Sequence, residues 1–66
     1  MSGYMPTPGQ LRSQARDHRH WAKNAKQPAR RAAHLQIAAT LEHEARAIEL
    51  DQAARQRAAL LRSAAA

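Results

Sequence analysis

Pro28 is the feature that most constrains the fold, because it separates two stretches that both have the apolar period of an α-helix. A proline cannot continue a helix, and it disfavours helical backbone at the preceding residue, here Gln27. It is well suited to the first turn of a new helix. The sequence therefore predicts two helices joined by a turn at residues 26–28.

The first predicted helix covers residues 8–26 and has clear start signals. Thr7 can act as the N-cap, Pro8 fits the first helical position, and Gln10 stands where a capping box needs Glu or Gln. Residues three and four apart share one face of a helix. The apolar face of this helix therefore consists of Leu11, Ala15, His18, Ala22 and Ala25.

The second predicted helix covers residues 28–62, and no Gly or Pro interrupts the chain after Pro28. Two acid–base pairs at i,i+4 spacing, Glu42–Arg46 and Asp51–Arg55, support it. We expect residues 63–66 to fray and residues 1–6 to form a flexible arm. The apolar stripe begins with Leu35, Ala38, Leu41, Ala45 and Ile48, then moves onto Leu50, Ala54, Ala58 and Leu61.

The predicted fold class is all-α, an antiparallel helical hairpin in one domain covering residues 7–62. A single helix kinked at Pro28 is the alternative. Folding back about Gln27 places residue 11 near residue 44, so the second helix overhangs beyond about Leu50. Since that overhang still carries apolar residues, we expect a homodimer that packs two hairpins into a four-helix bundle.

Composition limits how this hairpin can be stabilised. The chain has 66 residues, no Cys, no Phe and one Trp, so a core must come from Ala, Leu, Ile and Trp21. Short chains bury little surface, and without disulfides self-association is the remaining remedy. The heavy use of Ala and Arg is typical of bacterial or phage proteins from high-GC genomes.

A basic seam runs along the first helix beside its apolar face. The net charge is +6, yet residues 32–66 balance four Arg with four acids, so the excess lies in the first half. Arg12 is expected to pair with Glu42 or Glu44, which leaves the other four members without an acid in their own hairpin. The basic seam consists of Arg12, Arg16, Arg19, Lys23 and Lys26.

Three interpretations of the basic seam stay open at this stage. It can be a row of phosphate contacts on nucleic acid. It can bind an acidic protein surface, including Glu49 and Asp51 on the overhang of a second copy. It can also be a solvated face whose side-chain stems cover a thin Ala core.

Trp21 and the histidines are the remaining candidates for residues with a functional role. Trp21 is interpreted as the largest core group or as an anchor for a partner. Either His20 or Trp21 can approach His34 across the hairpin, and a pH-dependent interface through His18 has no further support. The residues expected at a protein interface are Trp21, Ile48, Leu50, Ala54 and Leu61.

No motif points to catalysis, a cofactor or a metal site. The serines lack His and acid companions at a known spacing, and Glu42 and Glu44 point apart on a helix. No HExxH spacing, Gly-rich phosphate loop, secretory segment or long apolar span is present. We therefore expect a cytoplasmic protein that is not an enzyme, does not enter a membrane and takes no small-molecule substrate.

Part of the chain resembles a group of short, mostly uncharacterised bacterial two-helix proteins of the alphaproteobacterial type. The likeness covers residues 11–49 and rests on Arg12, Ala15, Arg19, Ala22, Pro28, Arg31, Leu35, Ala38, Glu42 and Ala45. The chain departs from that group in having Gln27 before the proline and in its more basic first helix. In size and plan it is also similar to the repressor-of-primase family of plasmids, whose dimeric helical hairpins bind paired RNA loops.

These features predict a small regulatory or adaptor protein that acts by self-association and by helix-mediated contact with another protein. The alternative is a hairpin that binds RNA or DNA through the basic seam.

Overall fold

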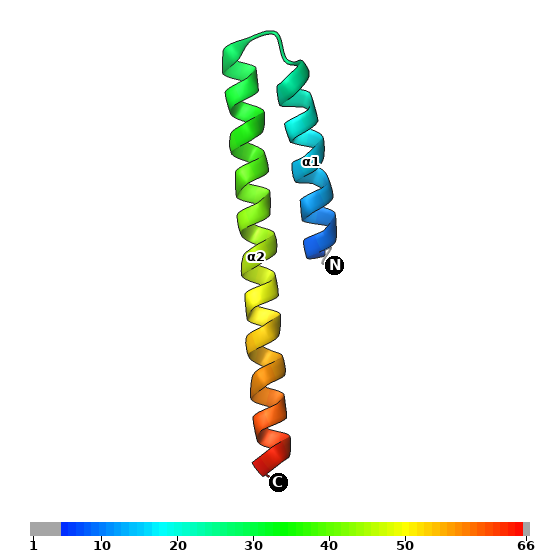
Figure 1. Cartoon of the computed structure of the whole chain (residues 1–66), viewed down its shortest axis with the longest axis vertical. Coiled ribbons are helices and arrows are strands. Elements are labelled where there is room, and N and C mark those ends of the chain that lie inside the picture. Colours follow the sequence, from blue (N-terminus) through cyan, green and yellow to red (C-terminus); the bar gives the residue numbers. More distant parts are fainter. Residues whose placement is uncertain (1–4, 66) are drawn as a thin grey trace.

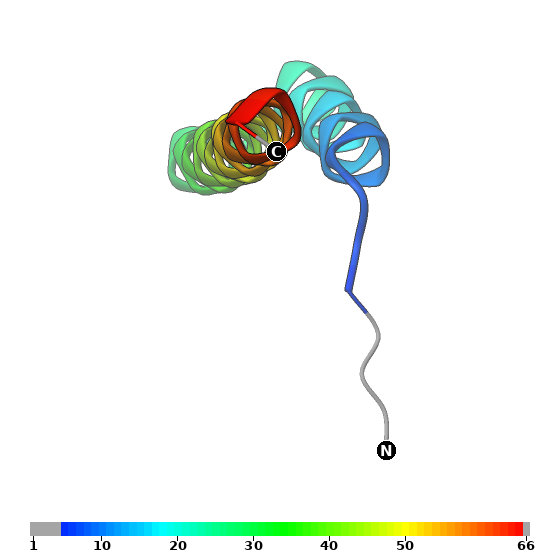
Figure 2. The same ribbon diagram turned by 90° about the horizontal axis from the view of Figure 1, so that it is seen from below.

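The computed structural model describes residues 5–65, which form two helices, α1 (Pro8–Asn24) and α2 (Pro28–Ala65). The helices run antiparallel, side by side, and a short turn joins them at one end of the molecule (Figure 1). Seen along its length, the molecule is a single layer of two helices (Figure 2). The prediction of an all-α hairpin is confirmed, and the alternative of one kinked helix is wrong.

The start of α1 follows the predicted capping box. The backbone N–H of Gln10 donates to the Thr7 hydroxyl over 3.1 Å, and the backbone N–H of Thr7 donates to the Gln10 side-chain carbonyl over 2.8 Å. Two N–H groups that the helix itself cannot satisfy are thereby bonded, with Pro8 in the first helical turn.

Helix α1 is two residues shorter at its C-terminal end than predicted. The helix ends at Asn24 instead of residue 26, because Ala25 has extended backbone with ψ 132°. The side chain of Asn24 donates to the His20 carbonyl over 2.9 Å and so satisfies one of the last carbonyls of α1. Arg31 in α2 donates to the Ala25 carbonyl over 3.1 Å. Three non-helical residues thus reverse the chain, and Arg31 ties the second helix to them.

The core between the helices is thin and made mostly of alanine. Leu11 is the one large buried side chain in the described range; the others are Ala15, Ala22, Ala38 and Ala45. Of the predicted apolar face of α1, His18 and Ala25 are half-buried and the rest is buried. Because an Ala side chain buries little apolar area, this core contributes few kcal/mol and depends on close helix contact.

The unequal helix lengths make the molecule elongated. Helix α1 has 17 residues and α2 has 38, so the second half of α2 extends past α1 (Figure 1). Its Cα radius of gyration is 17.0 Å, whereas a compact chain of this length has about 11 Å.

Helix α2 runs to Ala65, three residues beyond the predicted end. Residues 63–65, predicted to fray, are helical, because an uninterrupted Ala-rich sequence favours helix. Residue 66 and residues 1–4 of the predicted arm lie outside the described residues.

Candidate functional site

Two members of the basic seam form a ladder of ion pairs with α2. Arg12 binds Glu49 through two hydrogen bonds of 2.6 Å each, in the parallel fork arrangement that suits guanidinium and carboxylate. Arg19 pairs with Glu42. The two arginines are seven residues apart on α1 and the two glutamates are seven residues apart on α2, so the two pairs form successive rungs along one edge of the hairpin.

Pairing shifts the pKa of both Arg12 and Glu49. Hydrogen bonds from Arg12, with a smaller Coulombic contribution, hold the pKa of the Glu49 carboxyl below its usual value. The same hydrogen bonds raise the pKa of the Arg12 guanidinium. Glu49 is therefore a fixed negative charge at neutral pH and anchors the free end of α1.

This ladder corrects three predictions. Arg12 pairs with Glu49, not with Glu42 or Glu44. Arg19, expected to have no acid in its own hairpin, pairs with Glu42. Glu49 therefore lies beside α1, so it is not part of an overhang left for a second copy.

The direction of the side chains explains why Arg12 pairs with Glu49 and not with Glu42 or Glu44. Helical side chains point back toward the N-terminus of their own helix. Arg12 therefore leans away from the turn, whereas Glu49 leans toward it. The two charged ends meet at a larger sequence separation than the backbone positions alone suggest.

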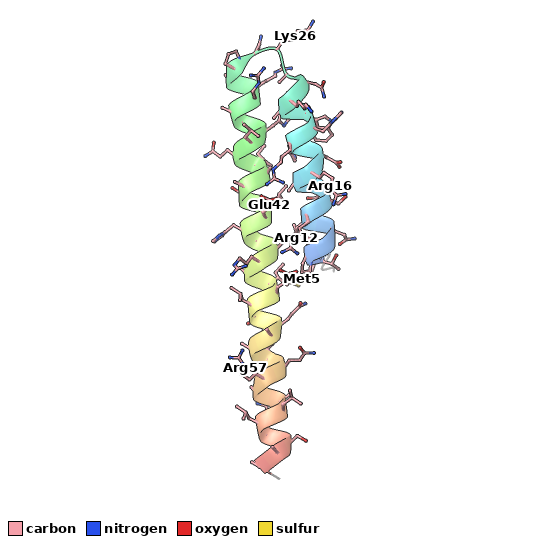
Figure 3. All side chains as sticks on the ribbon, in the orientation of Figure 1. Met5, Arg12, Arg16, Lys26, Glu42 and Arg57 are labelled. Atoms are coloured by element: carbon pink, nitrogen blue, oxygen red, sulfur yellow. The ribbon has the colours of Figure 1, made fainter. Side chains whose placement is uncertain are left out.

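The rest of the basic seam remains cationic. Among residues 5–65, Arg16, Lys23 and Lys26 make no ion pair. Lys26 lies in the turn, and Arg16 lies on α1 away from Glu42 (Figure 3). No acid occurs in residues 18–41, where Arg30 and Arg31 add to the positive charge. The uncompensated charge is therefore concentrated toward the turn end of the hairpin.

A ring cluster occupies the other edge of the hairpin near the turn. The Nδ1 atoms of His18 and His34 are 2.9 Å apart, so one ring donates a hydrogen bond to the other. Trp21 stands edge-on to His18 at a centroid distance of 5.0 Å and lies 5.8 Å from His34. Trp21 thus approaches His34 as predicted, but His20 does not, since its ring faces Asn24.

Trp21 is 50% exposed and therefore belongs to the edge of the hairpin, not to its buried core. A shallow hollow beside it is lined in part by Lys26, Arg30 and His34. The surface at the turn end thus combines one aromatic face with several cations.

The half of α2 beyond α1 displays large apolar side chains. Leu50, Leu60 and Leu61 are 58%, 70% and 66% exposed. Ala54 is also exposed, whereas Ile48 is half-buried and lines a hollow with Met5 and Pro6. The residues predicted at a protein interface are therefore divided: Leu50, Ala54 and Leu61 share α2 beyond the core, Ile48 faces the start of α1, and Trp21 lies near the turn.

Sequence reasoning missed the pairing of the seam with Glu42 and Glu49. The signal was available, because Arg12 and Arg19 are seven residues apart and so are Glu42 and Glu49. Two matched spacings of seven on antiparallel helices predict two rungs. The contact between His18 and His34 has no such signal, since it depends on the crossing of the two helices.

Two kinds of feature are absent from the described residues. No cluster of three or more His, Asp or Glu side chains in residues 5–65 could hold a metal ion. Neither described helix has a stretch apolar enough, at sufficient length, to span a membrane.

Comparison with known proteins found no matching family model, no matching curated protein and no matching solved structure.

Proposed function

We propose that this chain is a small, non-enzymatic, cytoplasmic regulatory or adaptor protein that acts by self-association and helix-mediated contact with other proteins. The observation that carries the proposal is the exposed apolar surface of α2 beyond α1, where Leu50 and Leu61 are each more than half exposed. They are eleven residues apart, about three helical turns, and therefore share one face of α2. Exposed apolar surface on one face is typical of protein interaction sites.

The thin core supports the same conclusion. A hairpin with one buried leucine and four buried alanines gains little from burial on folding. A 38-residue helix that extends past its partner gains stability when another helix covers the extension.

Sedimentation of the purified protein over a range of concentrations tests self-association. We expect a concentration-dependent dimer that the double substitution Leu50→Asp and Leu61→Asp weakens at least about 30-fold, since burying one leucine contributes about 1.5–3 kcal/mol. Both positions are exposed, so circular dichroism should show unchanged helix content. A wild-type protein that stays monomeric at millimolar concentration would contradict this part of the proposal.

Affinity capture from a host-cell extract tests for other partners. The wild type and the doubly substituted protein are compared with and without nuclease. The proposal expects a protein that the wild type retains after nuclease treatment and that the substituted protein loses.

One observation favours nucleic-acid binding as a second candidate. The turn end of the hairpin carries Lys23, Lys26, Arg30 and Arg31 with no acid in residues 18–41, and half-exposed Trp21 lies beside them. Phosphate contacts need free cations, and an aromatic face can stack on a base.

Salt dependence tests this second function. If these four cations all contact phosphates, the logarithm of the binding constant for single-stranded RNA or DNA should fall with the logarithm of salt with a slope of about −3. Lys23→Glu with Arg30→Glu should abolish binding, whereas Arg46→Glu with Arg57→Glu, at two exposed positions of α2 outside the turn end, serves as the charge-matched control. No binding to any RNA or DNA at low salt would exclude it.

A further inference from the structure

Five apolar residues in the second half of α2, four of them exposed and Ala58 half-buried, form a stripe that we call the back stripe. Its residues are spaced three or four apart and therefore share a helix face. Ala54 is nine residues from buried Ala45, which at 3.6 residues per turn places it on the side of α2 opposite α1. The back stripe consists of Ala47, Leu50, Ala54, Ala58 and Leu61.

The side of α2 that faces α1 is mixed in character beyond the end of α1. The line that runs through Ala38 and Ala45 continues at helical spacing through Gln52, Gln56 and Ser63, with Leu60 beside it. The back stripe, by contrast, stays apolar from residue 47 to residue 61.

A charge row runs directly beside the back stripe. It consists of Glu44, Asp51, Arg55 and Arg62, all exposed, with spacings of seven, four and seven. Three of them directly follow a stripe residue in sequence, as flanking positions of a coiled coil do. The only contact among them in the described structure is the surface pair Asp51–Arg55 at 3.1 Å.

The order of signs in this row is informative. It reads acid, acid, base, base, and it reverses its sign about Ala53, since Glu44 and Arg62 are each nine residues from Ala53. In a parallel pair the two rows lie on opposite flanks of the interface and do not meet. In an antiparallel pair every acid meets a base.

We propose that a second copy of this chain covers the back stripe, with the two α2 helices antiparallel and a two-fold axis beside Ala53. Glu44 then lies opposite Arg62 of the partner subunit, and Asp51 opposite Arg55 of the partner subunit. The proposal rests on the self-association proposed above and specifies its surface, orientation and register.

The exposed surface area of the chain is large enough for an interface with a second copy. The chain exposes 5498 Å², whereas a compact monomer of this mass exposes about 4,200 Å². The excess is about 1,300 Å² per chain, and a stable interface needs about 800 Å² from each partner.

The register also fixes the architecture of the dimer. Because the back stripe and α1 lie on opposite sides of α2, the two α2 helices are central and each α1 is outermost. Residues 41–65 of the two copies overlap, and the turn ends point in opposite directions. At about 1.5 Å per residue, the two starts of α2 are about 75 Å apart. The four helices thus form a row instead of a compact bundle.

Single cysteines test the orientation, and the chain has none of its own. In the antiparallel dimer, residue 54 is displaced from its copy by about 3 Å along the axis and residue 47 by about 18 Å. A short bismaleimide should therefore cross-link Ala54→Cys but not Ala47→Cys. Both alanines are exposed, so folding is preserved. Equal cross-linking of both variants would show a parallel pair and overturn the proposal.

Charge exchange tests the register. One variant carries Arg55→Glu and Arg62→Glu, the other Glu44→Arg and Asp51→Arg. Each alone should self-associate at least tenfold more weakly than the wild type, and a mixture of the two should form a heterodimer. The control, Lys23→Glu with Arg30→Glu, changes the net charge by the same amount as the first variant but lies outside the row and should keep the wild-type affinity.

The outcomes separate this proposal from the proposed function. A wild type that dimerises, with charge-row variants that dimerise equally well and do not prefer each other, overturns the register and leaves self-association intact. A wild type that is monomeric at all concentrations overturns both.

Discussion

Leu11 should contribute more to stability than any other side chain of the hairpin. It is 3% exposed and is the only large residue among the five that are buried in residues 5–65. Truncating a buried leucine to alanine costs about 2–5 kcal/mol, and the lower end applies here because the thin, open core can partly collapse around the space. We therefore expect Leu11→Ala to lower the free energy of unfolding by about 2–3 kcal/mol.

That loss is large for a chain of this size. At about 0.05–0.15 kcal/mol per residue, 66 residues have a total stability of about 3–10 kcal/mol. A loss of 2–3 kcal/mol should lower the thermal midpoint by about 10–20 °C. Since an isolated helix as short as α1 is marginal in water, we expect it to detach and unfold in the variant.

Thermal unfolding followed by circular dichroism and by Trp21 fluorescence measures the effect at matched protein concentration. Leu60→Ala is the control, because it removes the same atoms from a side chain that is 70% exposed. We expect that control to stay within about 0.5 kcal/mol of the wild type. If Leu11→Ala shifted the midpoint no more than Leu60→Ala, the packing of α1 on α2 described above would be wrong.

Three further substitutions test separate parts of the hairpin by thermal or chemical unfolding. Ala45→Leu should destabilise by about 1–3 kcal/mol by forcing the helices apart, whereas Ala39→Leu on an exposed position should not. Gly9→Ala should stabilise by about 0.4–1 kcal/mol, since its backbone φ is negative and an added Cβ meets only the Thr7 hydroxyl, at 3.8 Å; a loss of stability would show strain there. Because Arg12 lowers the pKa of Glu49, the pair stabilises the fold above the ordinary Glu value of 4.5 and stops doing so as pH falls through the lower folded value. Glu49→Gln should therefore flatten the fall of the thermal midpoint below pH 4.5, and an unchanged acid profile would contradict the pairing.

The positions of the helices followed from local signals in the sequence. Thr7, Pro8 and Gln10 predicted the start of the first helix, and Pro28 predicted the start of the second, because each acts within one turn of its own position. The end of α1 was harder to predict, since it depends on how many residues the chain needs to reverse direction.

The pairing between the helices could be predicted only in part. An interface made of alanines has no bulky side chain to fix which residues face each other, so counting from Gln27 gave an approximate alignment. The long side chains of Arg12 and Glu49 then reach beyond that alignment along their helices. The ion pairing of the basic seam was predicted wrongly for the same reason, because Arg19 was assigned no acid of its own.

The distribution of acids along α2 supports the antiparallel orientation on electrostatic grounds. All acids except Asp17 lie in residues 42–51, where Glu42 and Glu49 neutralise two cations of α1. The turn end has no acid, and each chain carries a net charge of +6. A parallel dimer would bring two cationic turn ends together, whereas the antiparallel one separates them by about 75 Å, many times the Debye length of about 8 Å in physiological salt. The charges of the whole chain and the signs of the charge row therefore favour the same arrangement, and raising the salt concentration should weaken the preference for it.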